Sequence, residues 1–382
     1  MKIFSCDTCH HPVFFENVQC LNCGSPLAFL PDQLNIAALQ EATPQDEAQA
    51  APSARLWQCV NAPEPRTSYR MCLNHDLYQA CNFAVPQEDP NPLCISCRQT
   101  RVLPDLSLPG NQHRWYLIEV AKRRLFYTLA RLGLAPTQEQ GPDTPGPAYA
   151  FLADQPGGPA IMTGHKAGLI TLNIAEADDD ERARRRLLLH EPYRTLLGHL
   201  RHESGHYYWN QLIRDAGRTP AFRETFGDES ADYESALQQH YAAGHGGSDW
   251  HNDYVSSYAT AHAWEDWAET WAHYLHMVDL LETAAAFRTN MVVPGTKPMP
   301  RKGVSNPFDS PETDFTQLVQ QWVPVTLLLN SLNRSLGQSD AYPFALSPGA
   351  LRKLRFVHEV IHESTRKPVV DGTDAARPVS AA

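Results

Sequence analysis

The segment from Leu200 to Trp209 contains His202, Glu203 and His206 in the spacing H-E-x-x-H. Two histidines four residues apart lie on one face of a helix, so both imidazoles can bind a single Zn²⁺ ion. The carboxylate between them is placed to act as a general base on zinc-activated water. These residues predict a hydrolytic zinc site, with His202 and His206 as ligands and Glu203 as the base.

A catalytic zinc site needs a third protein ligand, and this requirement separates two copies of the spacing in the chain. Glu265 and Glu269 lie four residues apart in a helical pattern, so one can bind zinc while the other accepts a hydrogen bond from a ligand histidine. The second copy, His358 to His362, has no acidic helix after it, and we expect its histidines to be exposed on a terminal helix. Three side chains near Glu265 stay open as rival ligands: Asp266, His262 and His273.

All nine cysteines lie within the first 97 residues, which indicates metal binding in that part of the chain. Without a secretory signal, paired C-x-x-C cysteines more often bind zinc than form disulfides. Two such pairs complete a tetrahedral site of four thiolates. The first predicted structural zinc site comprises Cys6, Cys9, Cys20 and Cys23.

The second group of cysteines offers five candidates for four places. Cys94 and Cys97 form a C-x-x-C pair, and a second structural zinc site is expected from four residues: Cys72, Cys81, Cys94 and Cys97. Cys59 lies farther away along the chain and His75 is an alternative ligand, so both stay open. Neither cysteine segment is long enough to bury a large core, so zinc binding would supply folding free energy.

The composition disfavours several classes of protein. The 382 residues carry a formal net charge of −11, so the overall field does not attract phosphate backbones and we do not expect nucleic acid as a partner. No stretch of about 18 apolar residues is present, and the first residues lack the apolar core of a signal peptide. We therefore expect no membrane association and a cytoplasmic location.

Hydrophobic periodicity predicts a mostly helical chain from Glu176 onward, after a short β-hairpin formed by Ile161-Met162 and Gly168–Asn173. The predicted helices cover Trp115–Leu129, 178–190, 193–214, 228–242, 254–286, 313–336 and 347–364. Trp264, Trp267 and Trp271 recur at helical spacing and are expected to pack in the core.

Two segments are interpreted as connections between these elements. Residues 31–55, rich in Ala, Gln, Glu and Pro, are expected to form a helical or flexible connector, and Pro136–Pro159 a linker or surface loop. A solvated basic face on the helix between them is expected from four residues: Arg114, Lys122, Arg123 and Arg124.

Together these residues resemble a known group of enzymes. The H-E-S-G-H segment at 202–206, a preceding strand at 168–173 and a later E-x-x-x-E helix are similar to the gluzincin metallopeptidases. The stretch around Glu265 is similar to the anthrax-lethal-factor-like branch, where a tyrosine precedes the ligand glutamate by seven residues, as Tyr258 does here. With the N-terminal cysteines, nearly all of residues 1–365 resembles the bacterial zinc-binding metallopeptidase family that carries a zinc-ribbon domain.

The resemblance implies a role for each residue of the site. The catalytic zinc would be bound by His202, His206 and Glu265. Glu203 would act as the general base, Glu269 would orient a ligand histidine, and Tyr258 would donate its O–H to the oxyanion of the tetrahedral intermediate. The strand at 168–173 would pair with an extended peptide substrate.

One departure from the family pattern is the gap between the ligands. His206 and Glu265 are separated by 58 residues, more than in thermolysin-like members. The inserted residues, including Asp228–His240 and Gly244–Gly247, are expected to shape or cover the cleft.

We therefore expect an α+β protein in which a pair of zinc ribbons, with rubredoxin-like knuckles, precedes a mainly helical zincin-like metallopeptidase domain with a small β-sheet. The expected ranges are ribbons at 1–30 and 56–108, a linker at 31–55, the metallopeptidase domain at 109–365 and a disordered tail at 366–382.

The expected activity is zinc-dependent hydrolysis of peptide bonds in a peptide or protein substrate. It would use one catalytic and two structural zinc ions, with the ribbons either structural or recruiting a protein partner. Two alternatives stay open: a zinc-ribbon adaptor with a catalytically silent zincin domain, and hydrolysis of an amide in a small molecule or modified peptide.

Overall fold

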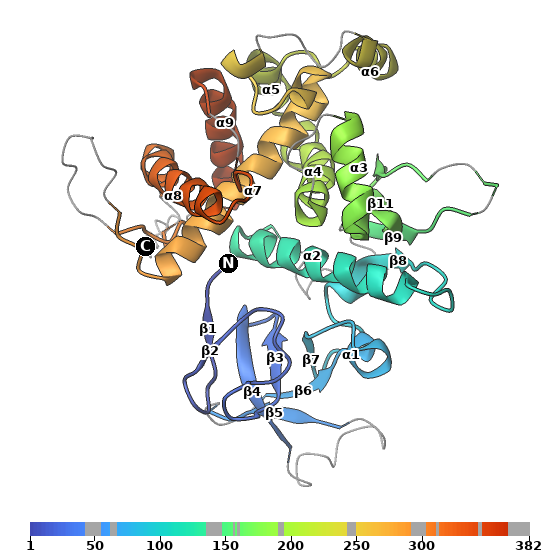
Figure 1. Cartoon of the computed structure of the whole chain (residues 1–382), viewed down its shortest axis with the longest axis vertical. Coiled ribbons are helices and arrows are strands. Elements are labelled where there is room, and N and C mark those ends of the chain that lie inside the picture. The colour runs from blue at the N-terminus through green and yellow to red at the C-terminus, as the bar shows by residue number, and fades with distance from the viewer. Residues whose placement is uncertain are drawn as a thin grey trace, which may run out of the picture.

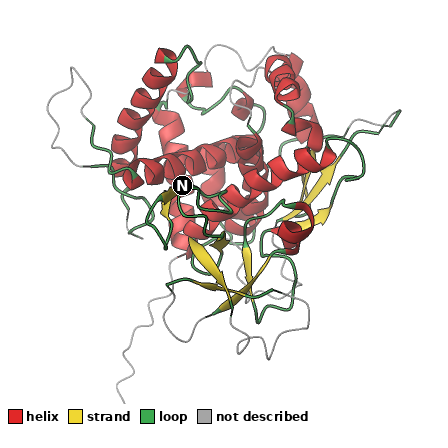
Figure 2. Cartoon of the chain, turned by 60° about the horizontal axis from the view of Figure 1, so that its bottom comes forward, coloured by secondary structure: helices red, strands yellow, loops and turns green. Residues whose placement is uncertain are grey.

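The computed structural model describes eleven stretches of the chain: 1–42, 55–61, 67–134, 147–155, 157–158, 161–189, 195–242, 250–291, 303–310, 313–342 and 346–365. The tail expected to be disordered lies outside them. The described strands and helices form a mixed α+β protein in which a cysteine-rich β part precedes a mainly helical part (Figures 1 and 2). Within these stretches, no helix is long and apolar enough to cross a membrane.

The cysteine-rich part is built around one five-stranded antiparallel sheet of order β3-β4-β5-β6-β7. Its strands are β3 Leu27–Leu30, β4 Asn35–Glu41, β5 Trp57–Cys59, β6 Ser68–Met71 and β7 Ala84–Pro86. A two-stranded sheet of β1 Phe4–Ser5 and β2 Pro12–Val13, and helix α1 Leu73–Tyr78, complete this part. The two expected ribbons therefore share a sheet.

Strand β4 corrects the interpretation of residues 31–55 as a helical or flexible connector. Ile36, Ala37, Ala38 and Leu39 are consecutive and buried, which is the pattern of a strand covered on both faces rather than of an amphipathic helix. Residues 43–54 lie outside the described part of the chain.

Helix α2, Asn111–Arg131, joins the two parts of the protein (Figure 1). Phe126 and Tyr127 pack into the aromatic core of the cysteine-rich part, whose other aromatic members are Phe4, Phe15, Phe29 and Phe83. Trp115 and Leu125 of the same helix belong to the core of the helical part.

The expectation of a solvated basic face on α2 is wrong for two of its residues. Lys122 and Arg123 are buried. The Lys122 ammonium lies 2.9 Å from Glu119 Oε2, and Arg123 donates a hydrogen bond of 2.8 Å to the carbonyl of Ala80. Glu119 compensates the charge of Lys122, and the hydrogen bond from Arg123 to Ala80 ties α2 to the cysteine-rich part. Arg114 is part-buried and forms an ion pair of 2.8 Å with Asp178, in the helical part.

A second sheet, of order β10-β11-β9-β8, lies in the helical part. Its strands are β8 Thr100–Val102, β9 Ala148–Leu152, β10 Gly164–Lys166 and β11 Leu169–Asn173. The predicted hairpin is confirmed as β10 and β11, although its first strand begins at Gly164. Strand β9 lies within the segment expected to be a loop, and it pairs in parallel with β8 and β11.

Seven helices follow the second sheet in the described residues: α3 Asp179–Leu189, α4 Leu196–Trp209, α5 Thr219–Phe226, α6 Tyr233–Ala242, α7 Ala263–Ala286, α8 Phe315–Ser335 and α9 Pro348–Thr365. All but α5 overlap predicted helices. The helix expected over 254–286 begins only at Ala263, because the His262 side chain caps it by accepting a hydrogen bond from the amide of Trp264.

Candidate metal centre and active site

Helices α4 and α7 pack against each other and bring together the three side chains predicted to bind the catalytic zinc. His202 Nε2 lies 3.0 Å from Glu265 Oε2, and His206 Nε2 lies 3.5 Å from Glu265 Oε1. All three residues are buried, and one potential ligand atom from each lies within 4.8 Å of the others. The carboxylate of Glu265 thus faces both imidazoles.

Local sequence explains why the two helices approach so closely at this point. Thr195 begins α4 as its N-cap, with its hydroxyl accepting a hydrogen bond of 2.9 Å from the amide of Gly198. Gly205 lies on α4 between His202 and His206 and faces α7. An added Cβ at this position would be only 3.0 Å from the Cα of Ala268 and 3.1 Å from Trp271. The absence of a side chain at Gly205 therefore lets α4 and α7 meet beside the site.

Glu269 lies one turn after Glu265 and contacts His202 on its other ring nitrogen. The distance from His202 Nδ1 to Glu269 Oε1 is 2.7 Å, and Ser256 donates a hydrogen bond of 2.6 Å to the second oxygen of Glu269. Burial opposes a positive charge on His202, but hydrogen bonds to Glu265 and Glu269 outweigh it and raise the pKa of His202 well above its usual value. Because Nδ1 donates to Glu269, Nε2 is the nitrogen left for a metal.

Glu203 is buried beside this triplet and is held by a residue that the sequence did not indicate. Its Oε1 atom lies 3.2 Å from Nε2 of His199, one turn earlier on α4. Burial alone would raise the pKa of Glu203, but the hydrogen bond with His199 and nearby histidine charges lower it below its usual value. The carboxylate form, which a general base requires, is therefore favoured.

Two tyrosines lie at the site, one expected and one not. Tyr258, in a 3-10 turn (Tyr258–Thr260), has its ring centroid 6.0 Å from that of His202. Tyr233, at the start of α6, donates a hydrogen bond of 2.7 Å to Glu265 Oε1, and its hydroxyl also interacts with that of Tyr258. Tyr233 lies in the segment inserted between His206 and Glu265. Its distance along the chain from the ligands follows no pattern that would have identified it from the sequence. Gly244–Gly247 lie outside the described residues.

The three rival ligands have other partners. Asp266 pairs with the ammonium of Lys353 at 2.5 Å. His262 caps α7 and contacts the carbonyl of Ala231 at 3.1 Å, while His273 Nδ1 lies 2.5 Å from the hydroxyl of Tyr342. Among the described residues, none of the three belongs to the cluster that can hold a metal.

The second H-E-x-x-H copy has a structural environment, and the expectation that both its histidines are exposed is wrong. His358 is buried, and its two ring nitrogens lie 2.9 Å from the hydroxyl of Tyr274 and 3.0 Å from the carbonyl of Thr313. His362 is half-buried. Both ring nitrogens of His358 are therefore engaged in attaching α9 to α7 and to the start of α8.

The strand at 168–173, which is β11, is expected from the sequence to pair with a substrate, but the free edge of this hairpin belongs to β10. Strand β11 is paired on both sides, with β10 and β9, so its backbone cannot accept a further strand. The edge strand next to β11 is β10. Its His165 ring lies 6.3 Å from that of His206, and Trp264 lies on the same imidazole with a centroid distance of 3.9 Å.

Both predicted cysteine groups are assembled with spacings that suit zinc. In the first group, the Sγ–Sγ distances are 3.7 Å between Cys6 and Cys23 and 3.6 Å between Cys9 and Cys20. A tetrahedral site with Zn–S bonds of about 2.3 Å has edges of about 3.8 Å, whereas a disulfide bond is about 2.05 Å long. These distances therefore match four separate thiolates around one ion.

The second group consists of Cys72, Cys81, Cys94 and Cys97, all buried. Cys81 and Cys94 have their sulfurs 3.7 Å apart, and the backbone amide of Cys94 lies 3.3 Å from the sulfur of Cys72. The two alternatives left open by the sequence lie outside the cluster: Cys59 is buried on β5, and His75 Nδ1 contacts the carbonyl of Cys81 at 2.9 Å.

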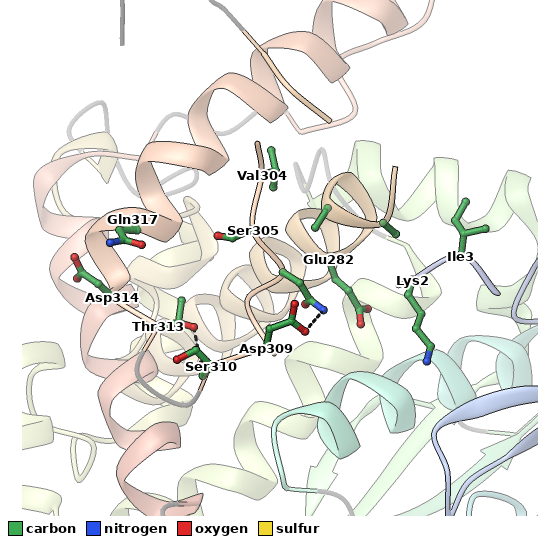
Figure 3. A pocket seen from close by; sticks show the side chains of 13 residues that line it. Lys2, Ile3, Glu282, Val304, Ser305, Asp309, Ser310, Thr313, Asp314 and Gln317 are labelled. Carbon is green, nitrogen blue, oxygen red and sulfur yellow. Dashed lines mark hydrogen bonds between the residues drawn. The ribbon is translucent and has the colours of Figure 1, made fainter. Parts of the chain in front are cut away.

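A cavity of about 700 Å³ lies elsewhere, at the end of α7 and the start of α8 (Figure 3). Lys2, Glu282 and Asp309 point toward it, and Asp309 accepts a hydrogen bond of 2.7 Å from Asn306. None of the residues that line it belongs to the metal clusters or to the Glu203 environment. The cavity is therefore separate from the candidate active site.

The donor chemistry of the buried triplet fits zinc. Two imidazoles and one carboxylate form a His₂Glu set, which leaves a fourth position for water or substrate. The Nδ1–Glu269 contact supports His202 in the orientation that such a ligand needs. His202, His206 and Glu265 would hold the ion.

Comparisons with known proteins agree with this division of the chain. A sequence model of the family described as "putative zinc-binding metallo-peptidase" matches residues 111–360, and one described as a zinc-ribbon domain matches residues 3–108. Uncharacterized proteins of Mycobacterium bovis and of two Mycobacterium tuberculosis strains are each 38% identical over 368 residues, which cover 95% of this chain and 96% of theirs. No solved structure matches the chain.

Proposed function

We propose that this chain, which belongs to the zinc-binding metallopeptidase family and carries that family's N-terminal zinc-ribbon domain, hydrolyses peptide bonds. The observation that carries the proposal is the position of Glu203 beside the His202–His206–Glu265 triplet. Its Oε2 atom is buried and has no hydrogen-bond partner among the described residues. A carboxylate with one held oxygen and one unpaired oxygen is suited to exchange a proton with a water molecule.

In this mechanism the triplet holds zinc, and Glu203 moves the protons. A zinc ion at such a site lowers the pKa of water to about 7 and polarises a carbonyl group. Glu203 accepts a proton from the attacking water through Oε2 and then delivers it to the amine that leaves. The burial of Glu203 excludes bulk water from competing for that proton.

The two tyrosines would have different roles: one would stabilise the negative charge that develops on the substrate oxygen, and the other would hold a ligand. Tyr258 is assigned the donor role, and one such donor contributes about 3 kcal/mol to lowering the barrier. Tyr233 would hold Glu265 in place through its hydrogen bond to Oε1. Glu269 would hold His202 in the same way.

An extended peptide would bind along β10, the edge strand next to α4. Edge strands offer unpaired backbone groups to an added strand, and the same edge carries His165 toward His206. The two cysteine sites would hold one structural zinc each. With the catalytic ion at the triplet, the chain would hold three zinc ions in total. The cysteine sites would stabilise the sheet that packs on α2.

The test is the substitution Glu203→Gln, which keeps the shape of the side chain but removes its basicity. We expect the variant to keep its zinc and to lose at least about 100-fold in kcat on a peptide mixture analysed by mass spectrometry, since general-base catalysis contributes about 10²–10⁴-fold. Glu234→Gln, at an exposed position on α6, is the matched control and should keep full activity.

Three outcomes would contradict the proposal. Equal turnover by Glu203→Gln and the wild type would exclude Glu203 as the base. A zinc-loaded wild type that cleaves no peptide but hydrolyses a small amide would change the substrate class. Failure on both kinds of substrate would leave the zinc-ribbon adaptor as the function.

A further inference from the structure

A chain of three side chains leads from the second sheet to Glu203. His199 lies between two carboxylates: its Nε2 is 3.2 Å from Glu203 Oε1, and its Nδ1 is 2.7 Å from Glu176 Oε2. Glu176 belongs to the 3-10 turn Ile174–Ala177, directly after β11. The chain therefore connects the hairpin to the general base through α4.

Glu176 is itself held firmly. Only 1% of its surface is exposed, and its Oε1 accepts a hydrogen bond of 2.6 Å from the hydroxyl of Thr163. The Thr163 oxygen in turn accepts a bond of 3.2 Å from the backbone amide of Asn173. Burying a carboxylate is costly unless it is paired, so this arrangement indicates that the pairing with His199 is a specific feature of the fold.

The hydrogen-bond directions follow from the chemistry of the groups. A carboxylate only accepts, so His199 donates its Nδ1–H to Glu176 and its Nε2–H to Oε1 of Glu203. His199 thus occupies Oε1 of Glu203. The other oxygen, Oε2, is the atom without a hydrogen-bond partner among the described residues.

We propose, resting on the proposed function, that Glu176 and His199 are positioning residues that hold Oε1 of Glu203 and leave Oε2 free to exchange protons with water. A glutamate side chain has several rotatable bonds, and a displacement of about 1 Å in a reacting group can cost about 100-fold in rate. The pair fixes the carboxylate before the substrate binds.

The kinetic test compares His199→Ala, His199→Gln and Glu176→Gln with the wild type. We expect His199→Ala to lower kcat 10- to 100-fold while KM and the zinc content stay unchanged, because the base is misplaced but the ligands are intact. His199→Gln supplies an amide N–H that can reach Glu203 and should restore part of the lost rate. His358→Gln is the control for loss of a buried histidine, and it should keep the wild-type kcat.

The second measurement does not depend on activity. In ¹⁵N-histidine NMR spectra of the zinc-loaded protein, Glu176→Gln should shift the Nδ1 resonance of His199, and Glu203→Gln should shift its Nε2 resonance. These spectra need only the wild type and two isosteric variants, so they decide the question even where His199→Ala fails to fold.

The outcomes separate this inference from the proposed function. An unchanged kcat in zinc-loaded His199→Ala, or a His199 resonance that does not respond to Glu203→Gln, would overturn the positioning role. A wild type that cleaves no peptide while His199 responds to both substitutions would overturn the peptidase function alone. A fall in kcat with equal loss of zinc would show that His199 merely supports the metal site and would also contradict the proposal.

Discussion

His358 illustrates how a residue can match a catalytic spacing and yet serve the fold. Its Nδ1 accepts a hydrogen bond from Tyr274 on α7, and its Nε2 donates one to the carbonyl of Thr313. With Nε2 donating, Nδ1 of the neutral ring is the acceptor for the hydroxyl of Tyr274. Burial, and then the charge of His362, lower the pKa of His358 from 6.5 to about 4.

A pH dependence of stability follows from that shift. Between pH 6.5 and pH 4 the unfolded chain binds a proton at His358 that the folded chain does not, so the free energy of unfolding falls as the pH falls through this window. From pH 7.5 to pH 5 the loss amounts to about 2 kcal/mol. Urea unfolding at the two pH values should show that His358→Gln, which cannot titrate, loses about 2 kcal/mol less than the wild type. An equal loss in both proteins would mean that the pKa of His358 does not differ between the folded and unfolded chain.

At the scale of elements, the contact between α4 and α7 sets the distance between His206 and Glu265. We expect Gly205→Ala to force the helices apart, since the new Cβ would meet the backbone of Ala268. Overpacking costs about 1–3 kcal/mol, against a gain of up to about 1 kcal/mol in helix propensity. The separation should also weaken zinc binding at the triplet, measured by competition with a chelator.

The control for Gly205→Ala is Gly349→Ala on α9. An added Cβ there would clash with the backbone around Asn252 and Asp253, neither of which belongs to the ligand triplet. This variant should be destabilised but keep wild-type zinc affinity. If both variants lose zinc equally, general destabilisation rather than the helix contact explains the loss.

The sequence predicted those elements whose periodicity is regular and those sites whose spacing is local. The hairpin at Gly168–Asn173 and most helices are confirmed, because each is specified by residues close in the chain. Strand β9 was missed because it lies in a Pro/Gly-rich region and is recognisable only by its parallel partners, β8 and β11. His199 and Tyr233 were missed for the same reason: their contacts with Glu203 and Glu265 depend on how helices pack.

At the scale of the whole molecule, the zinc-ribbon part and the helical part share α2 as a common element. Phe126 and Tyr127 bury their rings in the aromatic core of the ribbon part, and the hydroxyl of Tyr127 donates a hydrogen bond of 2.7 Å to Glu282 on α7. Arg124 adds an ion pair with Glu16 at 2.5 Å. Loss of the ribbon sheet would therefore expose one face of a helix on which the active-site helices also pack.

This coupling makes the zinc sites distinguishable by elemental analysis combined with thermal unfolding. We expect three zinc ions per chain in the wild type, two in His206→Ala, two in Cys94→Ser and three in His362→Ala. Cys94→Ser should also lower the Tm, because structural zinc contributes folding free energy and its loss uncovers α2. A loss of about 3 kcal/mol lowers the Tm by roughly 6–12 °C in a domain of this size. His206→Ala should leave the ribbon zincs bound, since its ligand set lies in the helical part; if it retained all three ions, the triplet would not be a zinc site, and the ribbon part would be the functional unit of the molecule.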